Sequence, residues 1–187
     1  ALKIFTNISQ DHLDYHKTFD RYVAVKSSFF ADETPKLINK DDGKIRFNRK
    51  NCMTYGCDNP ATYKVAAYSL RDGISAVVQK IDKMVDFHSP MHGYFNLYNL
   101  LAAIAAADML QAASLEDIAE VVPNFAGVSG RMEVVSTEPL VIVDFAHTPD
   151  GMDKILDALK DKKLFVLFGA GGDRDRDKRP LMGKVAS

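Results

Sequence analysis

The chain has 187 residues, which is enough for one large domain or two modest ones. Its composition, 47% hydrophobic and 26% charged, is typical of globular proteins, and 24 basic against 25 acidic residues leave a formal charge of −1. This balance gives no global field for nucleic acid or an anionic membrane, and no apolar run approaches the roughly 20 residues that a bilayer-spanning helix needs. We therefore expect a cytoplasmic protein that neither binds nucleic acid nor inserts into membranes.

The first part of the chain combines short strands with clear helices. Apolar residues at helical spacing predict an amphipathic helix over residues 19–30 and a longer helix over residues 96–110. Residues 62–81 alternate loosely on both sides of Gly73, which is typical of a hairpin. The other elements expected here are a strand over residues 2–6 and a short helix over residues 115–122.

After the glycine-rich segment 127–130, the pattern becomes a regular alternation of strands and helices. Thr148 is expected as a helix N-cap, because Pro149 follows at the first helical position. The elements expected are a strand over residues 140–145, a helix over residues 150–159, a buried strand over residues 164–168 and a helix that starts at Pro180. This spacing predicts a parallel sheet and an α/β protein with a junction near Gly130.

A cluster of titratable side chains follows the first expected strand. Asp11-His12-Leu13-Asp14-Tyr15-His16 places two carboxylates and two imidazoles within six residues. Their nitrogen and oxygen atoms suit a divalent cation that also contacts phosphate. The alternative is a solvated polar turn in which an aspartate caps the next helix.

Lys26 lies seven residues after Phe19 and four after Tyr22, on the apolar face of the expected helix. A lysine in this position usually extends its ammonium group to water. Where water is excluded, desolvation lowers the pKa of the amine and leaves it nucleophilic. Such an amine can take up carbon dioxide as a carbamate, an anion able to hold a metal ion. Both interpretations stay open.

Polar side chains occur at two places where a nucleotide could bind. Asn96 is either the N-cap of its helix or a base-contacting amide, and Asn99 lies inside that helix, where asparagine is disfavoured. Asp144 ends an expected strand, and His147 lies in the following loop. Ligands of open α/β sheets bind beyond the carboxyl ends of strands, so both are candidates for contact with a ribose or phosphate. A capping or turn role is the alternative for Asp144.

Residues 169–179 join a glycine turn to a dense run of alternating charges that includes Arg174. The segment matches neither the GxGxxG fingerprint nor a P-loop. Arginine binds carboxylates in a bidentate manner, which makes the loop a candidate carboxylate site. The alternative is a surface loop crossed by salt bridges.

Together, five segments resemble the Mur ligases, and within that family the tripeptide synthetases. They are residues 6–16 with Lys26 downstream, residues 93–103, residues 130–134, residues 141–150 and residues 171–180. They occur in family order and span nearly the whole chain. The resemblance implies the rear part of a P-loop-type central ATPase domain over residues 1–130, followed by the first βαβα of a Rossmann-like domain over residues 131–187.

The resemblance implies metal-binding and catalytic roles for three residues. His12 matches the metal-binding histidine of these ligases, and Lys26 matches the lysine that is carbamylated in them and helps to hold a second magnesium ion. Arg131 matches an arginine that follows the domain junction and reaches the phosphates of ATP. ATP and Mg²⁺ are therefore the implied cofactors, with Lys26 and Arg131 as catalytic residues.

Five further positions match ligand-binding residues of the family. Asn96 and Asn99 match asparagines on the adenine side, Asp144 matches the ribose-binding aspartate, and His147 lies near the nucleotide. Arg174 matches the arginine that faces the carboxylate of the incoming amino acid. The resemblance thus implies contacts to the nucleotide from four residues and a contact to the amino acid from one.

The implied activity is an ATP-dependent amide ligation in peptidoglycan precursor synthesis. ATP phosphorylates the carboxylate of UDP-N-acetylmuramoyl-dipeptide, and the amine of a diamino acid attacks the acyl phosphate. Which diamino acid is added does not follow from these residues. No GxxxxGK[ST] loop occurs in the chain, so the phosphate cradle is expected before Ala1, and the chain alone is expected to be inactive and to bind ATP weakly.

Three positions depart from the family pattern without removing a proposed contact atom. Lys17 stands where glycine is common, Ser129 where proline is common, and Phe145 where tyrosine is common. Other Mur ligases and the folylpolyglutamate synthetases share the His, Lys and Asp framework, so they are the alternatives of the same class. A non-catalytic nucleotide-binding module is the alternative of another class, since it would also lack the loop. A His/Asp metallohydrolase is the third alternative.

Overall fold

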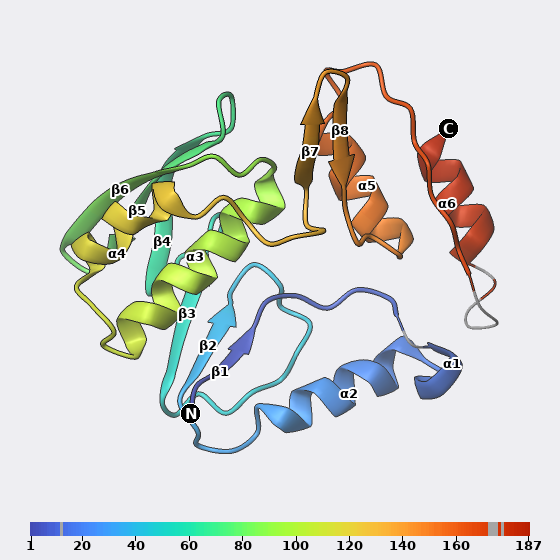
Figure 1. Ribbon diagram of the computed structural model, residues 1–187. Coiled ribbons are helices and arrows are strands. Elements are labelled where there is room, and N and C mark those ends of the chain that lie inside the picture. The colour runs from blue at the N-terminus through green and yellow to red at the C-terminus, as the bar shows by residue number, and fades with distance from the viewer. Residues whose placement is uncertain (12, 172–175, 177) are drawn as a thin grey trace. The chain divides into compact units, whose positions relative to one another are not determined.

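Figure 1 shows a computed structural model of the chain, which describes residues 1–11, 13–171, 176 and 178–187. The chain divides into two compact units. Unit 1 consists of Ala1–Ile8 and Thr18–Ala126, and unit 2 consists of Ser9–Lys17 and Gly127–Ser187. No helix in these described ranges combines the length and the apolar character that crossing a membrane requires.

Unit 1 is built on a six-stranded mixed sheet whose strands follow chain order. The first four strands are parallel to one another, and the last two are antiparallel to their neighbours. The strands are β1 (Lys3–Phe5), β2 (Lys36–Asn39), β3 (Cys52–Gly56), β4 (Tyr63–Ser69), β5 (Ile74–Lys80) and β6 (Lys83–Ser89). The sheet confirms the α/β class.

The hairpin predicted around Gly73 is confirmed by the antiparallel pair β4–β5. Gly73 has a φ of 82°, and a Cβ atom added there would lie 2.3 Å from the Ser89 carbonyl oxygen. Only glycine combines this left-handed conformation with so close an approach of a neighbouring strand. The turn is therefore determined by a single local residue.

Helices cover the sheet of unit 1 and build its main core. α3 (Tyr94–Met109) contacts β2, β3, β4 and β5, and it buries Leu97, Leu101 and Ile104 almost completely (Figure 1). The remaining helices are α2 (Phe19–Phe29), α4 (Leu115–Val121) and the 3₁₀ helix η1 (Val122–Asn124). The predicted helices of this unit are confirmed to within two residues at each end.

A second, smaller core in unit 1 gathers Phe5, Phe30 and Ile38, which are all buried. Half-buried Phe19 and Tyr22 of α2 pack against it, as the helical spacing predicts. The first turn of α2 is also stabilised locally, because Thr18 accepts a hydrogen bond from the Arg21 amide and caps the helix.

The described residues of unit 2 form a two-stranded antiparallel sheet and three helices. Its elements are α1 (Leu13–His16), β7 (Glu133–Thr137), β8 (Leu140–Val143), α5 (Pro149–Ala158) and α6 (Lys178–Ala186). The predicted N-cap of α5 is confirmed, since Thr148 Oγ1 accepts from the Gly151 amide at 3.1 Å and Pro149 opens the helix. α5 and α6 contact each other and bury Met152 and Met182.

The buried strand predicted over residues 164–168 is wrong. No strand is assigned there, and Phe165 and Leu167 are 93% and 100% exposed. An extended apolar segment becomes a buried strand only where a neighbouring strand takes its backbone hydrogen bonds and helices cover its faces. In the described part of unit 2 the neighbour of β8 is β7, in antiparallel orientation, so the predicted parallel βαβα arrangement is not formed.

Candidate functional site

Two linked asparagines lie in the first two turns of α3. Asn96 is buried, and its Nδ2 donates to the His92 carbonyl oxygen at 2.8 Å. Its Oδ1 accepts from Asn99 Nδ2 at 3.1 Å, and Asn99 itself is exposed. Gly93 is the N-cap of the helix, so the interpretation of Asn96 as a plain N-cap is wrong. Asn96 instead orients Asn99, whose amide is presented to solvent.

Asp41 ties the start of α3 to a neighbouring loop, a role that the sequence did not reveal. Its carboxylate accepts hydrogen bonds from the backbone amides of Cys57, Asp58 and Asn59 at 2.6, 3.0 and 2.7 Å, and from the Tyr98 hydroxyl at 2.7 Å. Burial raises the pKa of Asp41, but the hydrogen bonds outweigh this effect and lower it to about 2. In the sequence, Asp41 stands in a polar stretch that resembles a solvated turn.

Lys26 is exposed near the end of α2, with its Nζ 5.5 Å from the centroid of the Tyr22 ring. The desolvation expected from an apolar helix face is therefore not found. The physical reason is the length of the side chain, which passes along the aromatic ring and carries its ammonium group to water. Carbon dioxide uptake by Lys26 consequently does not follow from burial in unit 1.

In unit 2, Arg131 lies in a tightly hydrogen-bonded loop between the unit boundary and β7. Its backbone amide donates to the Val128 carbonyl at 3.0 Å, and its guanidinium lies over the Phe145 ring with 4.8 Å between Cζ and the ring centroid. Arg131 and Phe145 are both exposed. The guanidinium is thus held in place while its N–H groups face solvent.

Asp144 follows β8 and uses both carboxylate oxygens in turns. Oδ2 accepts from the Met132 amide at 2.8 Å, and Oδ1 accepts from the Ala146 amide at 2.6 Å. The turn role named as the alternative for Asp144 is therefore present. Each oxygen has a second lone pair, so these bonds are compatible with a further hydroxyl donor.

His147 is exposed and contacts groups on three sides. Its Nδ1 lies 3.2 Å from the Phe145 carbonyl oxygen, its ring stands edge-on to the Phe145 ring at 5.1 Å, and its Nε2 lies 3.7 Å from Asp11 Oδ2. His147 is thus an exposed imidazole that lies against Phe145 and Asp11.

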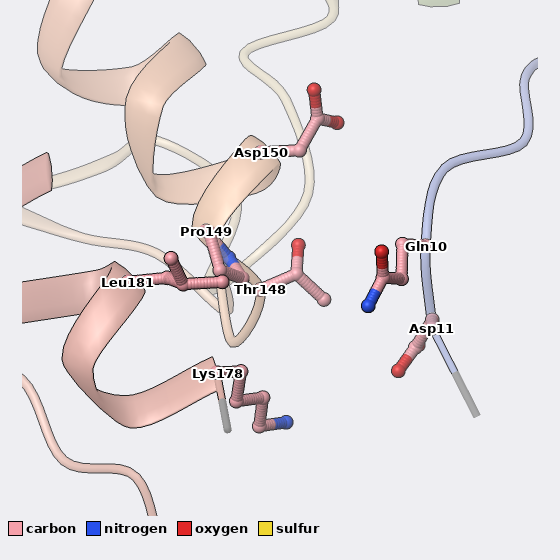
Figure 2. A pocket seen from close by; sticks show the side chains of 7 residues that line it. All are labelled: Gln10, Asp11, Thr148, Pro149, Asp150, Lys178 and Leu181. Carbon is pink, nitrogen blue, oxygen red and sulfur yellow. The ribbon is translucent and has the colours of Figure 1, made fainter. Parts of the chain in front are cut away.

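A pocket in unit 2 lies between the Gln10–Asp11 segment and the starts of α5 and α6 (Figure 2). Figure 2 shows Gln10 and Asp11 on the side opposite Thr148 and Lys178. The lining residues are Gln10, Asp11, Thr148, Pro149, Asp150, Lys178 and Leu181. With two carboxylates and one ammonium group, the pocket suits a small ligand that carries both charges.

Two predicted site residues, His12 and Arg174, lie outside the described residues. Within the described ranges, no three His, Cys, Asp or Glu side chains come together in a way that could hold a metal ion.

Comparison with known families gives two matches along the chain. The Mur ligase middle domain matches residues 1–107, and the Mur ligase glutamate ligase domain matches residues 130–187. A relative from Wolinella succinogenes, named UDP-N-acetylmuramoyl-L-alanyl-D-glutamate--2,6-diaminopimelate ligase, is 54% identical over 186 residues, which cover 100% of this chain and 43% of that protein. The chain thus spans less than half the length of the curated relatives it matches.

Solved structures show the same likeness. The structure of a ligase with the same name superposes with a TM-score of 0.69 at 33% identity and covers 99% of this chain and 41% of its own. An FPGS–AMPPCP–folate complex superposes with a TM-score of 0.79 at 20% identity and covers 99% and 48%. The second likeness is one of fold alone.

Proposed function

Because the chain belongs to the Mur ligase family, we propose that the complete protein is an ATP-dependent ligase of peptidoglycan precursor synthesis. It would join 2,6-diaminopimelate to UDP-N-acetylmuramoyl-L-alanyl-D-glutamate. The observation that carries this proposal is the 54% identity, along the full length of the chain, with the Wolinella succinogenes ligase of that name. Folylpolyglutamate synthesis is the weaker candidate, because its support is a likeness of fold at 20% identity. The nucleotide-linked substrates favour a cytoplasmic location.

The proposed reaction has two steps. A carboxylate oxygen of the muramoyl dipeptide bonds to the γ-phosphorus of ATP, and the bond from that phosphorus to ADP breaks. The amine nitrogen of 2,6-diaminopimelate then bonds to the acyl carbon, phosphate leaves, and one amine proton passes to a base. Negative charge on the phosphoryl oxygens rises in the first step, and Arg131 would offset it with N–H donors held in advance on the Phe145 ring.

We propose nucleotide-binding roles for four residues in two groups. In unit 1, Asn99 would hydrogen-bond the adenine, with Asn96 orienting it through the 3.1 Å bond between their side chains. In unit 2, Asp144 would accept from a ribose hydroxyl, and His147 would lie near the phosphates. The support is the amide and carboxylate chemistry of these side chains, which matches the donors and acceptors of a nucleoside.

His12 and Lys26 remain the proposed magnesium ligands, with Lys26 acting as its carbamate. Magnesium would supply charge neutralisation to the phosphates. Arg174 remains the proposed partner of the amino-acid carboxylate. The Gln10–Lys178 pocket, with its mixed charges, is a second place in unit 2 where a charged amino acid fits.

We propose the domain boundary near Gly130, with residues 1–130 in the central domain and residues 131–187 in the C-terminal domain. Support comes from the division into units between Ala126 and Gly127 and from the family match that starts at residue 130. Residues 9–17 cluster with unit 2, although they precede the boundary in sequence.

The activity is tested with the full-length protein, ATP, magnesium and the muramoyl dipeptide. Addition of 2,6-diaminopimelate should release ADP and phosphate in equal amounts and give a product whose mass has increased by one diaminopimelate residue. Lysine in its place should give little product. ADP release with a folate and glutamate, and none with the muramoyl dipeptide, would contradict the proposal.

The role of Lys26 is tested in the same assay. Lys26→Arg should abolish ligation, because a guanidinium cannot form a carbamate. Lys26→Ala should also be inactive, and a short carboxylic acid should restore part of the activity where bicarbonate does not. The matched control is Lys50→Arg, a change at an exposed lysine of unit 1 that pairs with Glu33. Full activity of the Lys26→Arg variant would contradict a catalytic role for Lys26.

A further inference from the structure

The loop that carries Arg131 is held by Glu133, the first residue of β7. Glu133 Oε2 accepts from the Ser129 hydroxyl at 2.8 Å and from the Gly130 amide at 2.6 Å. Hydrogen bonds from the Gly130 amide and the Ser129 hydroxyl lower the pKa of Glu133, so the acceptor is a carboxylate at neutral pH. The backbone immediately before Arg131 is thereby fixed.

The backbone after Arg131 is held by a second carboxylate. Asp144 accepts from the amide of Met132, and it also accepts from the amide of Ala146, the residue after Phe145. Met132 has a φ of 50°, a left-handed conformation that non-glycine residues adopt only when their surroundings require it. One side chain therefore fixes the neighbours of both Arg131 and Phe145.

The guanidinium of Arg131 lies over the Phe145 ring. A distance of 4.8 Å between Cζ and the ring centroid lies within the range of a cation–π contact. Phe145 is 61% exposed, so the ring contributes little to a buried core and is available as a platform. The ring covers one side of the guanidinium and leaves its other side for an anionic ligand.

We propose that Phe145 and Glu133 are positioning residues for Arg131, Phe145 by orienting the guanidinium and Glu133 by fixing the backbone beneath it. The proposal rests on the proposed role of Arg131 toward the transferred phosphoryl group. It requires that both residues affect ligation only through Arg131. Neither residue needs to touch ATP itself.

A double-mutant cycle in the full-length enzyme tests this requirement. Phe145→Leu should lower kcat/KM for ATP by about five-fold in the wild-type background, the loss expected for one cation–π contact. In the Arg131→Ala background, the same change should have less than about a two-fold effect. Phe145→Tyr keeps the ring face and should retain activity. The unfolding midpoint of each variant should stay at the wild-type value, because a purely structural role would move it.

Glu133→Ala provides an independent cycle, with Glu138→Ala as the matched control at an exposed acid of the same unit. Glu133→Ala removes the acceptor of both hydrogen bonds and should lower kcat/KM several-fold with Arg131 present and not in its absence, while Glu138→Ala should have no effect. Equal losses in both backgrounds would overturn the positioning proposal and leave the proposed function standing. Full activity of Arg131→Ala would overturn both roles, and an inactive wild-type enzyme would instead contradict the proposed ligase function.

Discussion

Replacement of Asp41 is expected to destabilise unit 1, because its carboxylate joins the start of α3 to the loop of residues 57–59. Asp41→Ala removes the acceptor of three backbone amides and of the Tyr98 hydroxyl. The amides of Asp58 and Asn59 are exposed and can bind water instead, and the Tyr98 hydroxyl has a second acceptor, Asp58 Oδ2, at 3.3 Å, whereas the Cys57 amide is partly buried. At about 1–3 kcal/mol for a buried donor left without an acceptor, with a smaller loss for the Tyr98 bond, the total should be about 2–3 kcal/mol.

The measurement is urea denaturation followed by near-ultraviolet circular dichroism of tyrosine. This signal reports mainly on unit 1, because six of the seven tyrosines lie there and only Tyr15 lies in unit 2. Asp41→Asn keeps one acceptor oxygen and should lose about 1–2 kcal/mol. Asp86→Asn, at an exposed aspartate of β6, is the control and should change stability by less than about 0.5 kcal/mol. A loss below about 1 kcal/mol for Asp41→Ala would refute this reasoning.

The same contacts predict a dependence on pH. The pKa of Asp41 in the folded state, about 2, lies below the ordinary value of 3.8, so its contribution to stability is complete above about pH 4 and is lost as the pH falls towards 2. The shift corresponds to about 2.4 kcal/mol, which screening by water at this half-buried site reduces to about 1–2 kcal/mol. Asp41→Asn should lack this part of the acid destabilisation, and Asp86→Asn should retain it. Parallel stability curves for Asp41→Asn and wild type would contradict the assignment.

Two further predictions concern local backbone structure. Ile81 is 74% exposed and has a φ of 54° in the two-residue connection between β5 and β6. Ile81→Gly should therefore stabilise unit 1 by about 0.5–1 kcal/mol, whereas the control Asp82→Gly, at a residue whose φ is not left-handed, should not. Equal effects of the two changes on the urea midpoint would rule out strain at Ile81. Thr148→Ala removes the N-cap of α5 and should lower the stability of unit 2 by about 1 kcal/mol, whereas Thr148→Ser should keep the cap. The measurement is the loss of helical circular dichroism on heating. An unchanged melting temperature of Thr148→Ala would show that the hydrogen bond from the Gly151 amide does not stabilise the helix.

The elements that the sequence predicted correctly depend on neighbours a few residues away. Helix α2 follows from apolar residues at helical spacing and from the Thr18 cap, and the β4–β5 turn follows from the left-handed Gly73. The start of α5 follows from Thr148 and Pro149. In each case a signal within a few residues of the chain predicts the element, and distant contacts agree with it.

The candidate site could be predicted as a set of residue types but not as an arrangement. Residue type and position inside a helix identified Asn99 as a candidate, and Arg131 followed from the resemblance to the Mur ligases. The sequence did not indicate that Asn96 is buried beneath Asn99, or that Phe145 supports Arg131. These pairings join residues whose relation depends on the path of the backbone between them.

Tertiary structure alone decided which apolar and charged residues are buried. Residues 164–168 have the composition of a core strand, yet Leu167 is fully exposed, because burial requires partner strands and covering helices that a sequence pattern does not contain. Lys26 shares a helix face with Tyr22 and still reaches water, because its long side chain can extend past the ring. Asp41 stands in a polar stretch of the sequence and nevertheless accepts hydrogen bonds from residues 57–59 and from Tyr98, because folding brings distant donors to one carboxylate.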